Sequence, residues 1–221
     1  MAVSRSGKKR RVAPRRARAP VVATTVPVRG RPRLTDRESL LDAAERAIRR
    51  SGPAVPLSEI AAEAGVTKPV LFARVGDRRA LVNAITERLL TRIEAAIQKA
   101  LASAPEGRAA LEALIAANLR TVGADRHVYA FANGAGASET SLEGTLEFAA
   151  RSAAPLIAGF AAARRKAGLD ESVAEPWGHA LIGMLHMVAL WWLREPIGKR
   201  AASRLAAQLT ELLWDGLGPR A

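Results

Sequence analysis

One short stretch, EAGVTKPVLFARVGD (63–77), breaks a helical pattern and restarts it at once. Gly65 follows a predicted helix over 57–64, and glycine readily takes the left-handed conformation found just beyond helix ends. Thr67 can cap a new helix. Pro69 is tolerated close behind it, because the N–H groups of a first helical turn have no intrahelical partner. The stretch therefore predicts two short helices joined by a tight turn.

Longer helices are predicted on both sides of this pair. The first begins at TDRE, where Thr35 and Glu38 can form a capping box, and ends at the SGP of 51–53. On the other side, Gly76 ends the second short helix and Asp77 caps a helix of about 24 residues, about 36 Å long. Its apolar residues recur every four positions, which indicates one buried face: Leu81, Ile85, Leu89, Ile93, Ile97 and Leu101.

The rest of the chain is also predicted to be helical. Alanine is abundant and aromatic residues make up only 4% of the 221 residues, which favours helices over sheets. No alternating strand pattern and no internal repeat occurs. The predicted fold class is therefore all-α, with further helices over 107–122, 125–132, 139–167, 173–194 and 199–215.

Positive charge is concentrated at the N-terminus. Residues 1–35 hold 11 of the 34 basic residues and no acid, so the remainder carries 23 basic against 21 acidic residues. Residues 1–33 lack apolar periodicity, and we interpret them as a basic arm that is disordered when free. Such arms bind polyanions, and nucleic acid is the expected partner.

Several other classes of protein are not expected. The chain has no Cys, and it lacks the nucleophile-elbow, phosphate-loop and zinc-protease motifs, so we expect no enzyme and no cofactor. His179 and His186 share a helix face but lack further ligands at metal-site spacing, so no metal is expected. The longest apolar run, WGHALIGMLHMVALWWL, is short for a membrane span, and the N-terminus lacks a signal-peptide pattern. A cytoplasmic protein is expected.

Two helices joined by a Gly-containing turn match the helix-turn-helix, whose second helix enters the major groove of DNA. The surrounding sequence, IAAEAGVTKPVLFARVGDRRAL, resembles the TetR family of transcriptional regulators, and the resemblance runs from about Leu34 to Leu90. It implies a DNA-binding domain over 34–80 and a helical effector-binding and dimerisation domain over 81–221. The expected function is a repressor that binds a pseudo-palindromic operator in double-stranded DNA as a homodimer. A small apolar ligand would release it.

The resemblance also implies which residues contact DNA. The recognition helix would run from about Lys68 to Arg74. Phe72 stands where the family often has Tyr, so only packing or contact with a thymine methyl is left to it. Ser58 is the alternative capping or phosphate-contacting group, because Pro56 occupies the usual capping position. The predicted contacts in this domain are Ser58, Thr67, Lys68, Pro69, Val70, Phe72, Arg74 and Arg78.

The arm offers a second mode of DNA contact. RGRP (29–32) resembles the core of an AT-hook, in which arginines enter the narrow minor groove of A·T-rich DNA. Arg29 and Arg31 would be the inserted residues. The alternative is attraction to phosphates without sequence preference, and both alternatives place the arm on DNA.

The C-terminal half carries the candidate residues for dimerisation and ligand binding. Its last two helices are apolar on more than one face, and the dimer interface is predicted at Met187, Trp191, Leu205, Leu209 and Leu212. These residues could instead complete the monomer core. An apolar effector cavity is predicted from His127, Tyr129, Phe131, Phe148, Phe160, Trp177 and Met184.

A second function class is an architectural DNA-binding protein without an effector. Its basic arm would dominate binding. The large, nearly neutral C-terminal half argues against this class, because such a protein has no need of it.

Overall fold

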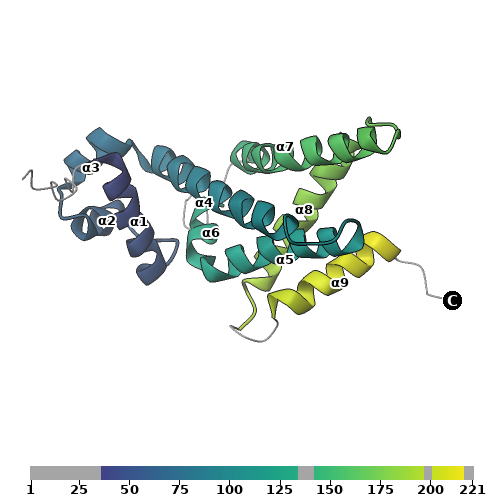
Figure 1. The fold of residues 1–221 in the computed structure, drawn as a ribbon. Coiled ribbons are helices and arrows are strands. Elements are labelled where there is room, and N and C mark those ends of the chain that lie inside the picture. The colour runs from purple at the N-terminus through teal and green to yellow at the C-terminus, as the bar shows by residue number, and fades with distance from the viewer. Residues whose placement is uncertain (1–35, 134–141, 197–200, 217–221) are drawn as a thin grey trace, which may run out of the picture. The chain divides into compact units, whose positions relative to one another are not determined.

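The computed structural model describes residues 36–133, 142–196 and 201–216, with side chains throughout except over 142–148. These residues form nine α-helices and no strand, which confirms the predicted all-α fold (Figure 1). None of the described helices is long and apolar enough to cross a bilayer. The helices are α1 (Arg37–Ser51), α2 (Leu57–Glu63), α3 (Lys68–Val75), α4 (Arg78–Leu101), α5 (Arg108–Ala124), α6 (Arg126–Ala132), α7 (Leu142–Lys166), α8 (Ala174–Trp192) and α9 (Ala202–Asp215).

The cap of α1 differs from the predicted capping box. Asp36 is the N-cap, and its carboxylate accepts a hydrogen bond of 2.7 Å from the backbone N–H of Ser39. A carboxylate in this position also interacts favourably with the positive end of the helix dipole. The predicted cap, Thr35, lies outside the described residues.

The turn between α2 and α3 has the predicted geometry. Gly65 adopts a φ of +66°, a conformation that favours glycine. The N–H of Val66 donates to the carbonyl of Ala61 over 3.0 Å, which closes the end of α2. Thr67 is the N-cap residue of α3, although its side chain makes no capping hydrogen bond. The turn thus holds two short helices against one core.

Helices α1–α3 share a closed hydrophobic core with the first turns of α4. Ile60 and Ala61 of α2, Leu71 and Val75 of α3, and Leu81 of α4 are all buried in it. Asp77 caps α4 by accepting from the N–H of Ala80 over 2.8 Å, as predicted. The 24 residues of α4 then continue beyond this core, and its inward face joins the C-terminal helices.

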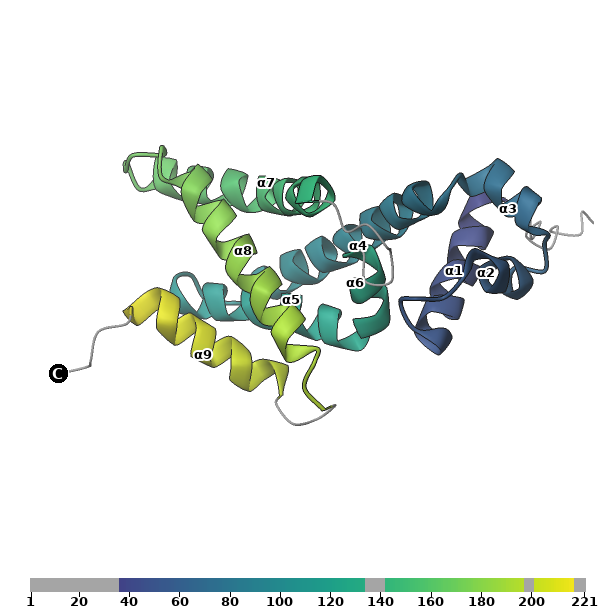
Figure 2. The same cartoon turned by 180° about the vertical axis from the view of Figure 1, so that it is seen from behind.

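The C-terminal helices pack in pairs. Helix α5 packs against α4 and α9, and α7 packs against α8 (Figures 1 and 2). Gly178 of α8 faces Ile157 of α7 so closely that a Cβ atom there would collide with the Ile157 side chain. The α7–α8 pair therefore depends on a residue without a side chain.

The short helix α6 touches both halves of the molecule. It packs against α1 and α4. Phe131 belongs to the core of helices α1–α3, whereas Tyr129 belongs to a cluster with Leu89 and Ile93 of α4 and Ala189 of α8. Seven residues thus link the two cores.

Candidate DNA-binding surface and effector cavity

The outer face of α3 presents the residues predicted to contact DNA. Val70 and Phe72 are 36% and 38% exposed, although large apolar side chains on a short helix normally pack inward. The ammonium of Lys68 lies 5.6 Å from the centre of the Phe72 ring, at cation–π distance. Thr67, Pro69 and Arg74 are also exposed. The structure therefore brings six of the predicted residues together on one helix.

Arg78 has a different position from the one predicted. Its guanidinium donates to the carbonyls of Val55 (3.1 Å) and Pro53 (3.2 Å) and lies 5.2 Å from the ring of Phe131. These contacts hold the α1–α2 loop against α4. In this arrangement the guanidinium faces the protein and stabilises the domain, instead of reaching a phosphate.

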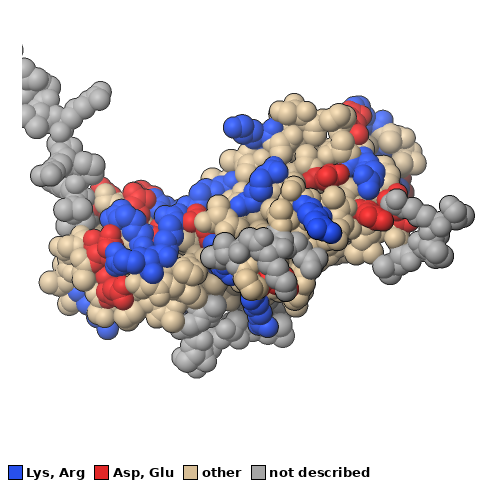
Figure 3. All heavy atoms as spheres, turned by 90° about the horizontal axis from the view of Figure 1, so that it is seen from below, with Lys and Arg blue, Asp and Glu red and all other residues tan. Residues whose placement is uncertain are grey.

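Basic side chains near α3 fall into two groups. Arg46 and Arg50 of α1 pair with Glu63, at 2.9 and 2.5 Å, and Arg50 also reaches Glu59 at 3.4 Å. Blue and red side chains lie next to one another at the end of the face in Figure 3 that holds α1–α3. Lys68 and Arg74 form no ion pair with any described residue, so their charge is available to an incoming polyanion.

The remaining residues predicted to contact DNA are Ser58, Arg29 and Arg31. Ser58 is exposed in the first turn of α2 and makes no capping hydrogen bond, so it stays a candidate for contact with phosphate. Arg29 and Arg31 lie outside the described residues.

A cavity of about 590 Å³ lies among α4, α5, α6, α7, α8 and α9. Its wall is mainly apolar, with Ile97 and Leu101 of α4, Leu111 of α5, and Leu156 and Phe160 of α7. Glu94 and Gln98 of α4 also line it and are exposed, so the cavity opens towards solvent along this helix. Its size and lining suit a small molecule with a largely apolar body.

Two ion pairs link α7 to α4 and to the loop that follows α4, one in the first half of α7 and one at its C-terminal end. Arg151 of α7 contacts Glu87 of α4 at 2.7 Å, and Lys166 at the end of α7 contacts Glu106 at 3.4 Å. Helices α4 and α7 therefore run in the same direction with the cavity between them.

Polar groups gather near the Arg151 end. The Tyr129 hydroxyl and Nδ1 of His186 are 2.8 Å apart. Burial raises the pKa of Tyr129 above its ordinary value and lowers that of His186, so both side chains are uncharged at neutral pH. Asn118 of α5 adds an amide to the same cavity.

The residues predicted to line the cavity have different positions in the structure. Tyr129 and Phe160 line the cavity. Met184 packs in the core beside it, and Trp177 contacts the edge of the Phe160 ring from outside, with ring centres 6.0 Å apart. The side chain of Phe148 lies outside the described residues.

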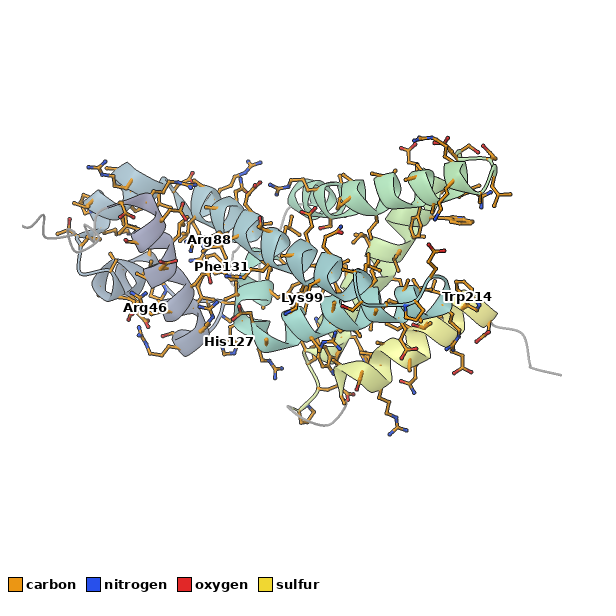
Figure 4. The ribbon with its side chains drawn as sticks, viewed as in Figure 1. Arg46, Arg88, Lys99, His127, Phe131 and Trp214 are labelled. Carbon is orange, nitrogen blue, oxygen red and sulfur yellow. The ribbon has the colours of Figure 1, made fainter. Side chains whose placement is uncertain are left out.

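Phe131 and His127 were expected in the cavity but face the DNA-binding helices. Phe131 is buried in their core, and Nδ1 of His127 donates to the carbonyl of Arg49 over 3.0 Å. Figure 4 shows both residues around α6, far along the ribbon from Trp214, which lines the opposite end of the cavity. The prediction for these two residues was wrong for a physical reason. Successive residues of a short helix point in different directions, and α6 has apolar surroundings both towards the cavity and towards the core of α1–α3.

Sequence reasoning missed several lining residues, above all Asn118, Arg151 and Trp214. Asn118 carried the best signal, because it is a polar residue in the otherwise apolar segment ALIAANL (113–119). Among the described residues, no group of three or more side chains could hold a metal ion.

The residues predicted at the dimer interface divide into two sets. Met187 and Trp191 of α8 are 64% and 45% exposed, and Leu212 of α9 is also exposed. Leu205 and Leu209, by contrast, are buried against α5 in the chain's own core. These two are therefore corrections: the inner stripe of α9 is used within one chain.

Comparison with known proteins accounts for both halves. The sequence profile of the bacterial regulatory proteins of the tetR family matches residues 40–85, and that of the tetracyclin repressor-like C-terminal domain matches residues 96–220. The chain belongs to the TetR family. This TetR-family protein is thus a DNA-binding transcriptional regulator.

Individual relatives agree with this assignment. The HTH-type transcriptional regulator Rv0472c of Mycobacterium tuberculosis is 29% identical over 209 residues, which cover 89% of this chain and 86% of the relative. The fold is similar to that of FadR from Bacillus subtilis in complex with stearoyl-CoA, with a TM-score of 0.64 and 17% identity over 82% of this chain and 99% of FadR. It is also similar to AibR in complex with isovaleryl coenzyme A and operator DNA, with a TM-score of 0.55 and 18% identity over 80% of this chain and 96% of AibR.

Proposed function

We propose that this TetR-family regulator is a repressor whose release from its operator is driven by a small, largely apolar ligand in the cavity between α4 and α7. The observation that carries the proposal is the position of α6. This helix lines the cavity on one side and enters the core of the DNA-binding helices on the other. A ligand that displaces α6 therefore acts directly on the helices that hold α3.

The contacts that α6 makes with other elements support this coupling between the cavity and the DNA-binding helices. Tyr129 faces the cavity, Phe131 packs beneath Arg78, and His127 bonds the carbonyl of Arg49 at the end of α1. Arg126 bonds the carbonyl of Leu193, just beyond α8. A ligand shifts the balance of two states only as far as it binds them with different affinity. Movement of α6 on binding supplies that difference.

An ion-pair network strengthens the contact between α1 and α6. Asp125, at the start of α6, accepts hydrogen bonds of 2.6 and 2.9 Å from Arg49. These bonds lower the pKa of Asp125 below its ordinary value. Arg49 and Arg92 also reach the buried carboxylate of Glu45, each at 2.7 Å. The network extends from α1 to α4 and α6.

The DNA-bound form is proposed to be a homodimer on a pseudo-palindromic operator. Each α3 would enter the major groove of one half-site, with Lys68, Arg74, Val70 and Phe72 facing the bases and backbone. The exposed face of α8 around Met187 and Trp191, with Leu212 of α9, is the proposed dimer surface. Leu205 and Leu209 are not part of it.

The lining of the cavity supports one class of effector as a proposal. Its mainly apolar wall suits an acyl chain or another apolar body. Acyl-coenzyme A molecules are the ligands in the FadR and AibR structures, which share this fold. An acyl compound is therefore the first ligand to test.

Footprinting on the DNA upstream of the protein's own coding region tests the proposal. We expect protection of a short pseudo-palindrome, and loss of that protection when the effector is added. Broad coating of the DNA without a defined site would instead favour an architectural protein.

We further propose that the basic arm over 1–33 binds DNA alongside α3. Each phosphate neutralised contributes about 0.9 to the slope of log affinity against log salt. If about four arm charges engage, deletion of residues 1–33 should flatten the slope by about 3–4. Minor-groove insertion by Arg29 and Arg31 predicts in addition that their double Ala variant loses more affinity on A·T-rich than on G·C-rich flanks. An unchanged slope would remove the arm from the DNA.

A further inference from the structure

Asn118 presents its side-chain amide to the cavity. The residue is only 8% exposed, and its side chain makes no hydrogen bond with the described residues. Its polar atoms are not among the fully buried atoms that lack a partner, so they reach the space inside the cavity. A ligand that displaces water from such an amide without replacing its hydrogen bond loses affinity. The Asn118 side chain lines the cavity, so a molecule inside the cavity can satisfy it.

The polar side chains that line the cavity together with Asn118 include an uncharged pair and a cation. Asn118 lies two helical turns beyond Leu111, about 10 Å nearer to the α6 end of α5. Tyr129 and His186, which bond one another, line the same cavity and are both uncharged at neutral pH. The cation of this region, Arg151, is engaged by Glu87 at 2.7 Å.

We propose that Asn118 determines ligand specificity by donating its amide N–H to an uncharged oxygen, a carbonyl or a hydroxyl, on an otherwise apolar effector. The ligand's apolar body then extends along Leu111 and Phe160 towards Leu101 and Trp214. This inference rests on the proposed effector function and names the ligand chemistry of that site. A charged carboxylate is disfavoured at Asn118, because burying it there requires a free cation.

A matched series of probes tests this preference. Butyrophenone and butylbenzene have the same size and differ by one carbonyl, and 4-phenylbutanoate supplies the charged alternative. Dissociation constants would be measured by calorimetry on the full-length wild-type protein. We expect butyrophenone to bind about tenfold more tightly than butylbenzene, the effect of one buried hydrogen bond, and more tightly than the carboxylate.

Two variants assign the preference to Asn118. Asn118→Leu has a similar volume without the amide, and Asn118→Ala removes the amide without adding atoms. In both, the advantage of butyrophenone over butylbenzene should vanish. Gln98→Leu is the control, because Gln98 offers the same amide to the same cavity from its exposed side. It should leave the advantage intact. Circular dichroism and thermal unfolding verify that each variant is folded.

The outcomes separate this inference from the proposed function. If ligands bind but the ketone has no advantage, or keeps it in both Asn118 variants, the role of Asn118 is wrong and the effector cavity stands. Tighter binding of the carboxylate overturns the preference for an uncharged oxygen. If no probe binds a protein that still recognises its operator, the effector proposal fails together with this inference.

Discussion

The DNA-binding helices α1–α3 and the C-terminal helices α4–α9 differ in where their packing is incomplete. The first set closes its core fully around residues such as Leu40, Ile60 and Leu71, and leaves apolar side chains of α3 on the outside. The second set leaves space on the inside, where α7 packs along α8 and stays apart from α4. Each region departs from ordinary packing at the place where a partner can bind.

The comparison teaches how each region tolerates change. A surface helix on a closed core can lose its outer side chains without loss of fold. A side chain in a cavity wall makes fewer contacts than one in a close-packed core. Truncating it therefore costs less unfolding free energy. Four predictions follow from this difference, beginning with the largest effect.

The largest effect is expected on the outer face of α3. Lys68→Ala combined with Arg74→Ala should weaken operator binding by about 2–6 kcal/mol, since each base contact contributes about 1–3 kcal/mol. The helical content should not change, because both side chains are exposed. Gel-shift titration measures the loss. Arg50→Ala, which removes a basic residue already paired with Glu63, is the control and should have little effect. An unchanged affinity in the double variant would place the recognition helix elsewhere.

The second effect concerns the outer face of α8. Met187→Glu places a charge on a residue that is 64% exposed in one chain, so the monomer should fold normally. If this face is buried between two copies, the charge is desolvated and the dimer should dissociate. Linked half-sites gain about 10²–10⁴ in affinity, and operator binding should fall by that factor. Sedimentation velocity reports the oligomeric state, with Glu211→Lys as an exposed control on α9. A dimeric Met187→Glu protein would move the interface.

The third prediction compares one substitution in both regions. Leu71→Ala removes a fully buried side chain from a closed core and should cost about 2–5 kcal/mol of unfolding free energy. Leu111→Ala enlarges a cavity that already exists and should cost less, about 1–2 kcal/mol. Urea unfolding, followed by circular dichroism, measures both. Equal losses would mean that the cavity wall is packed as tightly as the DNA-binding core.

The smallest effect lies where the two regions meet. Arg49 lowers the pKa of Asp125, so this carboxylate stabilises the folded state above its ordinary pKa of 3.8. That stabilisation is lost as the pH falls through the lower folded-state pKa. Asp125→Asn should therefore cost about 1 kcal/mol at pH 7 and nothing at the lowest pH. Thermal unfolding of both proteins from pH 7 to about pH 2.5 tests this. A difference that persists in acid would show that the pair's charge is unimportant.

Local sequence signals predicted much of the fold. Gly65, Asp77 and the four-residue spacing from Leu81 to Leu101 gave the helix boundaries of the DNA-binding region within a few residues. These features act through their own backbone or through neighbours one turn away. The placement of Val70 towards DNA came instead from the resemblance to the TetR family, and Val70 is 36% exposed on α3. Which residues of α3 contact DNA stays a prediction.

The cavity was much less predictable. Tyr129 and Phe160 were identified, but Phe131, His127 and Trp177 have other positions, and Asn118 was missed. An apolar residue on a helix must be covered, yet its spacing does not say whether another helix, a second copy or a ligand covers it. Leu209 and Met187 show the same ambiguity. Both lie on apolar faces, but only Leu209 packs within the chain.

The sequence by itself determined the all-helical fold and the turn at Gly65, because helix caps and helical periodicity act over a few residues. Only the tertiary structure decided that Arg78 faces the α1–α2 loop, that α6 joins the two cores, and that Asn118 faces a cavity. These outcomes depend on contacts between residues far apart in the chain. Which helices meet, and how closely, is set by the packing of all of them together.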